Sequence, residues 1–319
     1  MDPIFLLTTL LKCPLCGLDL LYKVDALLCG SGHSFPYQDK VIDFSTAQEI
    51  NDIQQRSKQS FQIEWTQYYQ NLGWAPQEFA HEKHMFLSYT RSMPNFFTNK
   101  IVIDAGCGNG RYINIVNKIS SPPPLLIIGI DLSDAVYVAA KNCFTSKNVV
   151  FMKMDINLLP KILKSQVDYI YSIGVLHHTP DAEKAFNNLA KCVKKDGFIS
   201  LFLYGKGNQI LYQVNMFLRN RFFRKWPHKY IYYLCVLMAI PCQTFKIKFF
   251  GYFIRDLITR VIYVDDDVHN LFDAYTAGWT SFYEKNEIEH WYHNMGFDHI
   301  VESHINHTSL YCIGRKLHE

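Results

Sequence analysis

The feature that most constrains this chain is a regular alternation of apolar runs and helical patterns between residues 100 and 204. The apolar runs are rich in β-formers and read KIVIDA, LLIIGID, NVVFMKMD, VDYIYSIG and GFISLFLY. The segments between them carry helical spacing, most clearly from Asp181 to Val193. Strands that are apolar along their whole length are buried on both faces, so this alternation predicts an α/β fold with a parallel sheet between helices.

The first apolar run leads directly into a glycine-rich turn, IVIDAGCGNGRY at 101–112. Glycine lets the backbone come close to a ligand and present N–H groups at a helix start. Gly106, Gly108 and Gly110 have the spacing G-x-G-x-G, not the G-x-G-x-x-G of dinucleotide-binding folds. The turn is either part of a cofactor site or a purely structural connection, and on its own it does not decide between the two.

Four elements in chain order resemble class I S-adenosylmethionine-dependent methyltransferases, whose first motif reads (D/E)xGxGxG. They are the glycine-rich turn, the run LLIIGID, the stretch MKMDINLLP and the stretch after the fourth run. The stretch YSIGVLHHTPD at 171–181 matches one common in the type 11 group, and SFQIEWTQYY is similar to the FGYEW element of that group. The resemblance implies a Rossmann-like seven-stranded sheet and S-adenosylmethionine as cofactor. It extends to the C-terminal helix and hairpin, which suit the sixth and seventh strands of that fold.

The resemblance also assigns roles to individual residues. Asp131, at the end of the second apolar run, would bind the ribose hydroxyls; Asp155 would accept a hydrogen bond from the adenine amino group, and Ile156 would pack on the ring. A helix cap and a surface turn are the plainer interpretations of the two aspartates. The cofactor-binding residues implied in this way are Asp104, Ala105, Gly106, Cys107, Gly108, Asn109, Gly110, Asp131, Leu132, Asp155, Ile156, Ser172, Ile173 and Gly174.

Catalytic residues carry a weaker signal. Methyl transfer from a sulfonium needs positioning above all, and a base only where the acceptor atom carries a proton. His177 and His178 are the best candidates for such a base, and a structural histidine pair is the equal alternative. Arg111 and Trp65 are expected to face the methionine end of the cofactor. The N/D-P-P-Y motif of amino-group methylation does not follow the fourth run, where HHTP stands instead.

A second motif lies near the N-terminus, where Cys13 and Cys16 are followed by Cys29 and His33. Three thiolates and an imidazole at these spacings form a closed tetrahedral Zn²⁺ site, in which no position is left for a reacting water. The sequence therefore predicts a structural zinc ion rather than a catalytic one. It would stabilise a segment too short to bury much of a core.

Two families have a similar module. Bacterial 23S rRNA guanine methyltransferases carry a Cys/Cys/Cys/His module before the catalytic domain, and HSFPYQDKVIDF resembles the zinc-ribbon tail (xxYPxxDGIPxF) fused to many type 11 methyltransferases. This chain departs from the ribbon pattern at His33 and at Lys40, where glycine is usual. The module therefore leaves the substrate open.

Charge is concentrated in one segment. Residues 206–260 carry a net charge of +9 in a chain of net charge +3, and aromatic residues are interleaved with the cations. Three interpretations remain open: a helical lid over an apolar or phosphorylated acceptor, peripheral contact with an anionic membrane, and RNA binding. The longest apolar run here is shorter than the roughly 20 residues that span a bilayer.

Nine cysteines in a chain of 319 residues do not fit a small disulfide-stapled domain, and IFLLTTLL makes a poor signal peptide. The chain is therefore expected to be cytoplasmic, with peripheral membrane contact left open.

Together these patterns predict a methyltransferase acting on a small-molecule, lipid or sugar biosynthetic intermediate. An RNA base methyltransferase and a non-catalytic methyltransferase-like binding subunit are the alternatives. The expected organisation is a zinc module at 1–46, a helical linker at 47–99, the cofactor-binding core at 100–204, a basic helical insertion at 205–278 and a C-terminal helix and hairpin at 279–319.

Overall fold

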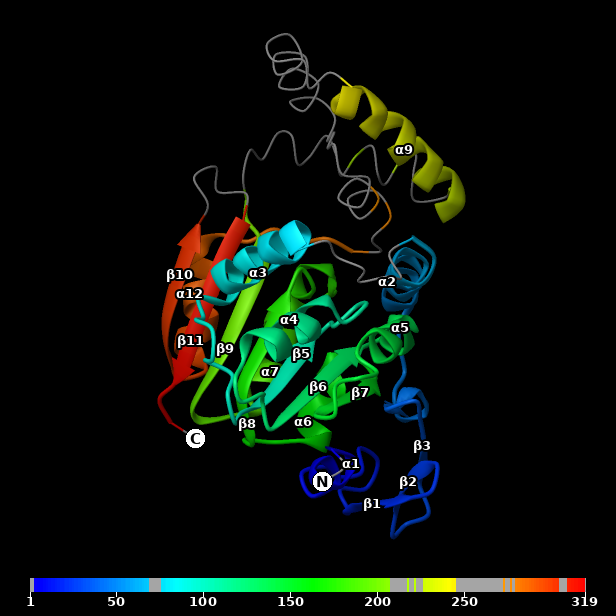
Figure 1. The fold of residues 1–319 in the computed structure, drawn as a ribbon, viewed down its shortest axis with the longest axis vertical. Helices are drawn as coiled ribbons and strands as arrows, with labels where there is room; N and C mark the ends of the chain where they lie inside the picture. Colours follow the sequence, from blue (N-terminus) through cyan, green and yellow to red (C-terminus); the bar gives the residue numbers. More distant parts are fainter. Residues whose placement is uncertain are drawn as a thin grey trace.

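The computed structural model describes residues 3–68, 76–206, 217, 221, 226–244, 272, 276, 279–303 and 309–318. Its centre is a twisted sheet between two layers of helices, and α9 (His228–Thr244) lies beyond the end of the sheet at which β9 finishes (Figure 1). The fold class predicted from the alternation of strands and helices is confirmed.

Five parallel strands occupy the places of the five apolar runs: β5 (Ile101–Ala105), β6 (Leu126–Asp131), β7 (Val149–Lys153), β8 (Val167–Ile173) and β9 (Val193–Tyr204). The hairpin of β10 (Phe297–Ser303) and β11 (Ser309–Lys316) adds two antiparallel strands beside β9. The order β7-β6-β5-β8-β9-β11-β10 contains the seven predicted strands. It also brings the carboxyl ends of β5, β6, β7 and β8 to one end of the sheet, called the carboxyl edge below.

Alternate residues of the strands enter two separate apolar cores. Ile103 belongs to one core, which also contains buried residues of helices α1 (Pro3–Thr8), α6 (Leu159–Ile162), α7 (Ala182–Ala190) and α12 (Lys285–Asn294). Val102 belongs to the other, which contains buried residues of α3 (Pro76–Thr90), α4 (Arg111–Ile119) and α5 (Ala135–Asn142). Burial on both faces explains why the strands read as continuous apolar runs.

The N-terminal module belongs to the same sheet. It consists of β1 (Leu20–Lys23), β2 (Ala26–Cys29), β3 (Ser34–Gln38) and β4 (Val41–Asp43), followed by the short turn η1 (Ser45–Ala47). Strand β4 pairs in parallel with β7, so the sheet has eleven strands instead of seven. The pairing covers the backbone groups that β7 would otherwise present at an open edge.

Lys40 has a structural reason to differ from the glycine of related ribbons. Its φ is 68°, in the left-handed region that glycine adopts most easily. Its ammonium donates hydrogen bonds to the carbonyl oxygens of Phe144 and Ser146, at 2.8 and 2.7 Å. The side chain thus ties the module to the loop before β7, which offsets part of the backbone strain.

The linker predicted to be helical contains α2 (Asp52–Ile63), the π-helical turn η2 (Glu64–Tyr68) and α3. Asn51 and Gln54 form a reciprocal capping box at the start of α2. Two further short turns, η3 (Ile156–Leu158) and η4 (Leu176–His178), follow β7 and β8. Residues of α2, η2, η3 and η4 lie at the carboxyl edge of the sheet, where β5, β6, β7 and β8 end.

Most of the predicted basic lid lies outside the described residues. Its described helix, α9, buries Ile231 and Cys235, and Tyr232 packs edge-to-face with Phe272 at 6.0 Å. The hydroxyl of Ser60 on α2 donates to Thr276 at 2.6 Å, which connects this region to the linker. Within the described part of the chain, no helix is long and apolar enough to cross a bilayer.

Candidate functional site

The glycine-rich turn connects β5 to α4 with three left-handed residues. Gly106, Gly108 and Gly110 have φ values of 89°, 50° and 81°. A Cβ at Gly106 would lie 2.3 Å from Cγ2 of Val175, and one at Gly108 would lie 3.1 Å from the ring of Trp65. Backbone conformation and close neighbours therefore both require glycine at Gly106.

Gly106→Ala is expected to lower the free energy of unfolding by about 1–3 kcal/mol more than Gly296→Ala does. Both glycines have positive φ, but nothing lies within 4 Å of a Cβ built at Gly296. The pair therefore separates overpacking against Val175 from backbone strain. Urea unfolding of both variants measures the difference, and equal losses of stability would contradict it.

Asp104, inside β5, is a buried carboxyl group directly before the turn. Burial raises its pKa to about 8, an effect that Asp131 adds to and that Tyr171 and Arg111 oppose. Its Oδ2 has no partner at hydrogen-bond geometry among the described residues. A buried carboxyl oxygen of this kind fits a site that receives a cationic group of a ligand.

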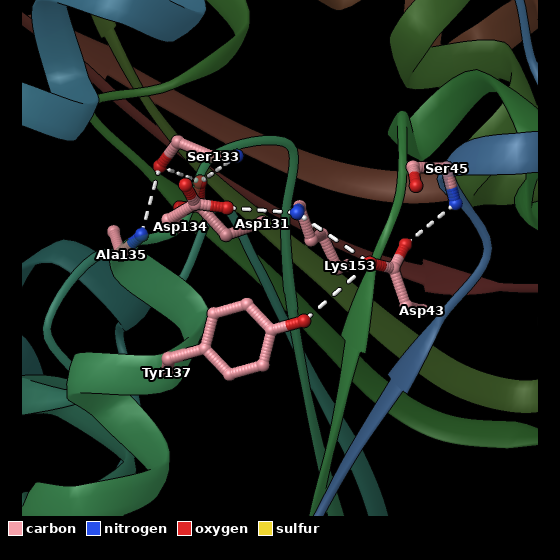
Figure 2. A network of polar contacts seen from close by, with 8 residues as sticks. All are labelled: Asp43, Ser45, Asp131, Ser133, Asp134, Ala135, Tyr137 and Lys153. Atoms are coloured by element: carbon pink, nitrogen blue, oxygen red, sulfur yellow. Dashed lines mark hydrogen bonds and ion pairs between the residues drawn. The ribbon is translucent and has the colours of Figure 1, made fainter. Parts of the chain in front are cut away.

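Asp131, the last residue of β6, faces the same turn. Its Oδ2 accepts a hydrogen bond from the Gly108 amide at 3.0 Å. Its Oδ1 accepts from the amide and hydroxyl of Ser133, at 2.8 and 2.7 Å, and Figure 2 shows these two contacts. Burial raises its pKa, and these hydrogen bonds act against that increase. The carboxylate does not cap α5, since the Ala135 amide donates to the Ser133 hydroxyl at 3.2 Å.

Asp155 follows β7 and is held by two glutamines that sequence reasoning missed. Its Oδ2 accepts from Nε2 of Gln54 at 2.5 Å, and its amide donates to Oε1 of Gln48 at 2.6 Å. Its Oδ1 accepts from the Asn157 amide at 2.8 Å, and the neighbouring Ile156 is buried. Nothing in the local sequence marks Gln48 or Gln54, because both reach Asp155 through the tertiary fold.

The remaining cofactor candidates differ in what their side chains do. Ser172 is fully buried and donates to the Ala105 carbonyl at 2.8 Å, which ties β8 to β5. A Cβ at Gly174 would meet nothing within 4 Å, so the chain is open there. The others lie at the same edge: Ala105, Cys107, Asn109 and Ile173 are buried, and Leu132 is partly buried.

Trp65 and Arg111 lie close to each other beside the turn. The Arg111 guanidinium is 5.6 Å from the Trp65 ring and 4.6 Å from the Tyr112 ring. It also lies 3.9 Å from the Glu82 carboxylate. Trp65 therefore lies beside the glycine turn, and its expected place at the methionine end of the cofactor stays a prediction.

His177 and His178 lie on η4, at the carboxyl end of β8. His177 is buried and stacks on Tyr204, with ring centroids 3.8 Å apart and an interplanar angle of 23°. Nδ1 of His178 lies 3.0 Å from the Trp279 carbonyl oxygen and 3.3 Å from Oγ1 of Thr280. Since a carbonyl only accepts, the first contact puts a proton on Nδ1 of His178.

The Cys/His motif converges in the N-terminal module. The ligand atoms of Cys13, Cys16, Cys29 and His33 all lie within 4.8 Å of one another. Sγ of Cys16 and Cys29 are 3.6 Å apart, and Sγ of Cys29 is 3.3 Å from Nδ1 of His33. Zn–S bonds of about 2.3 Å in a tetrahedron would separate two sulfur atoms by roughly 3.8 Å, so this donor set fits Zn²⁺.

The turns that follow Cys13 and Cys29 have glycine in the left-handed conformation and backbone hydrogen bonds that hold each turn tight. Gly17 and Gly32 have φ values of 77° and 84°, and their amides donate to the carbonyl oxygens of Cys13 and Cys29. A hydrogen bond from the Leu18 backbone lowers the pKa of Cys16 to about 6, which favours the thiolate that binds metal.

Residues 103–201 match the family described as "Methyltransferase domain". The chain is 30% identical over 115 residues to the ubiquinone biosynthesis O-methyltransferase of Nitrosomonas europaea, covering 35% of this chain and 47% of that one. It is 30% identical over 125 residues to the tRNA U34 carboxymethyltransferase of Campylobacter concisus, covering 38% and 41%. The chain thus spans less than half the length of these relatives.

Among solved structures, the chain is similar to magnesium protoporphyrin IX methyltransferase from Synechocystis. The two share 13% sequence identity with a TM-score of 0.47, over 84% of this chain and 99% of that one.

Proposed function

From the premise that residues 103–201 carry a methyltransferase domain, we propose that the chain is an S-adenosylmethionine-dependent methyltransferase. The observation that carries the proposal is the approach of two carboxyl groups at the glycine turn: Asp104, which is buried, and Asp131, which is partly buried and accepts a hydrogen bond from the Gly108 amide. S-adenosylmethionine, when bound, supplies an electrophilic methyl group on a sulfonium ion. The protein then has to bind the cofactor, exclude water and align the acceptor with that methyl group.

Each carboxylate has a distinct task in this proposal. Asp131 accepts hydrogen bonds from the ribose hydroxyls, and Ser133 and Gly108 fix its orientation beforehand. Asp155 accepts from the adenine amino group, and Gln54 holds the carboxylate in place. Asp104 receives the ammonium group of the methionine part, a cation that would stabilise its ionised form.

For the acceptor, we assign the role of general base to His178 and a supporting role to His177. The proton on Nδ1 of His178 leaves the lone pair of a neutral imidazole on Nε2, the atom that could take a proton from an acceptor hydroxyl. His177 is stacked on Tyr204 and supports the turn that carries His178.

The acceptor we propose is a small, amphiphilic biosynthetic intermediate, with lipids and sugars within this class. Two observations support it: the similarity to ubiquinone biosynthesis O-methyltransferases, and an exposed apolar face of α9. Tyr230, Tyr233 and Leu237 are 62%, 54% and 64% exposed along that face. Aromatic residues within the basic segment 206–260 also suit contact with an anionic membrane surface, where such an acceptor would reside.

An RNA acceptor is the second candidate, supported by the similarity to tRNA U34 carboxymethyltransferases and by the +9 charge of residues 206–260. The non-catalytic alternative predicts a degenerate cofactor site. Retention of Asp104, Asp131 and the three glycines of the turn argues against it.

The test is a calorimetric titration with S-adenosylhomocysteine, followed by incubation with methyl-labelled S-adenosylmethionine and three acceptor pools: lipid extract, aqueous metabolites and RNA. We expect binding at one site per chain and label in a non-RNA pool. Label only in RNA would establish the second candidate, and no binding would refute the proposal. Flotation with anionic but not neutral liposomes checks the membrane contact.

We also propose that Cys13, Cys16, Cys29 and His33 hold one structural Zn²⁺. The support is the convergence of their ligand atoms within 4.8 Å. Three sulfur ligands and one nitrogen ligand complete a tetrahedron, so the ion would hold the fold of the module and take no part in methyl transfer.

A further inference from the structure

Lys153, the last residue of β7, lies between two parts of the chain that are far apart in sequence. Its ammonium is 2.7 Å from Oδ1 of Asp134, at the start of α5, and 3.4 Å from Oδ2 of Asp43, the last residue of β4. Figure 2 shows the lysine between the two carboxylates. One cation thus joins the N-terminal module to the segment that begins α5.

The surroundings of Lys153 hold it in this place. Its side chain is only 14% exposed, and its ammonium lies 5.4 Å from the ring of Tyr137, a residue of α5. The Tyr137 hydroxyl donates to Oδ2 of Asp43 at 3.4 Å, and the Ser45 amide donates to Oδ1 of Asp43 at 2.8 Å. The ammonium of Lys153 therefore has several partners and is shielded from solvent, although Asp134 is 40% exposed, which sets the contact apart from an isolated ion pair on the surface.

The α5 end of this network is also the ribose-binding end proposed above. Asp134 is three residues after Asp131, and the Ser133 between them donates two hydrogen bonds to the Asp131 carboxylate. On the other side, Lys153 is the register partner of Asp131 in the sheet, and the Met154 amide donates to the Asp131 carbonyl at 2.9 Å. A shift of Asp134 would therefore change the position of the Asp131 carboxylate.

We infer that Lys153 is a positioning residue, through which β4 of the N-terminal module orders the 131–135 loop for the cofactor. The inference rests on the proposed function for its binding readout. The lysine would touch no reacting group; it would fix the loop that holds the ribose-binding carboxylate. Since coupling between two sites is reciprocal, ligand binding at the loop would also tighten the β4–β7 contact.

The principal test is Lys153→Met, which keeps the length of the side chain and removes the charge. We expect the Kd for S-adenosylhomocysteine to rise about 3- to 30-fold, with faster amide exchange at residues 131–137. Lys153→Arg should recover most of the affinity. The matched control is Lys194→Met, which breaks a Lys–Asp pair of 2.5 Å with Asp168, away from the glycine turn.

A double-mutant cycle shows whether the effect passes through β4. Asp43→Asn alone should weaken binding and speed exchange at 131–137. Combined with Lys153→Met it should add little, because both changes break the same contact.

Unchanged affinity and unchanged exchange in Lys153→Met, or fully additive effects in the double variant, would overturn the inference. If the wild-type chain binds no S-adenosylhomocysteine, the proposed function fails. The exchange comparison still tests the coupling in that case.

Discussion

Cys29→Ser is expected to abolish zinc binding and to unfold the N-terminal module. Cys29 is a buried member of the cluster, and the buried apolar residues around it, such as Leu27 and Phe35, belong to the main core rather than to a separate core of the module. Structural zinc contributes an apparent 10–16 kcal/mol or so in small zinc-binding folds, more than so short a segment can replace by apolar burial. Elemental analysis should give one zinc per wild-type chain and none in the variant.

The control for this experiment is Cys312→Ser, which changes a buried cysteine in β11 outside the cluster. It should lower stability while zinc content stays at one per chain. Equal zinc content in Cys29→Ser and wild type, or no zinc in wild-type protein purified without chelator, would refute the metal site.

The structure also changes what loss of zinc should do to cofactor binding. A zinc module that folded separately at 1–46, as the sequence suggests, would leave cofactor binding largely intact when it unfolds. Strand β4 instead pairs with β7, and Asp43 contacts Lys153, so an unfolded module would release both contacts. We therefore expect Cys29→Ser to weaken S-adenosylhomocysteine binding by about as much as Lys153→Met does.

Asp131→Ala is expected to weaken cofactor binding by about 1.5–3 kcal/mol, or roughly 10- to 150-fold in Kd. The substitution would remove the acceptor of the ribose hydroxyls. It would also leave the amides of Gly108 and Ser133 without the carboxylate that orders them. Calorimetric titration with S-adenosylhomocysteine measures the change.

Asp298→Ala is the matched control, because Asp298 is an exposed carboxylate on β10, an edge strand separated from β6 by β5, β8, β9 and β11. It should bind like wild type. Wild-type affinity in Asp131→Ala would mean that the ribose lies elsewhere, and the placement of the cofactor along β6 would have to be redrawn.

The sequence by itself determined the central sheet. Apolar runs of β-formers became β5 to β9 in the expected order, because a strand buried on both faces must be apolar throughout. The glycine turn could also be predicted from the sequence. At Gly106 the backbone is left-handed and Val175 lies close, and only glycine tolerates both. The Cys/His cluster followed from spacing, because two short turns can bring four ligands to one point.

Only the tertiary structure decided how these parts meet. Gln54 and Gln48 reach Asp155 across 101 and 107 residues of chain, a distance over which local periodicity carries no information. Likewise, no pattern in VID at 41–43 predicts that β4 pairs with β7. Strand pairing uses backbone N–H and C=O groups, which nearly every residue has. The link from the zinc module through Lys153 to Asp131 exists because three distant segments end at one edge of the sheet.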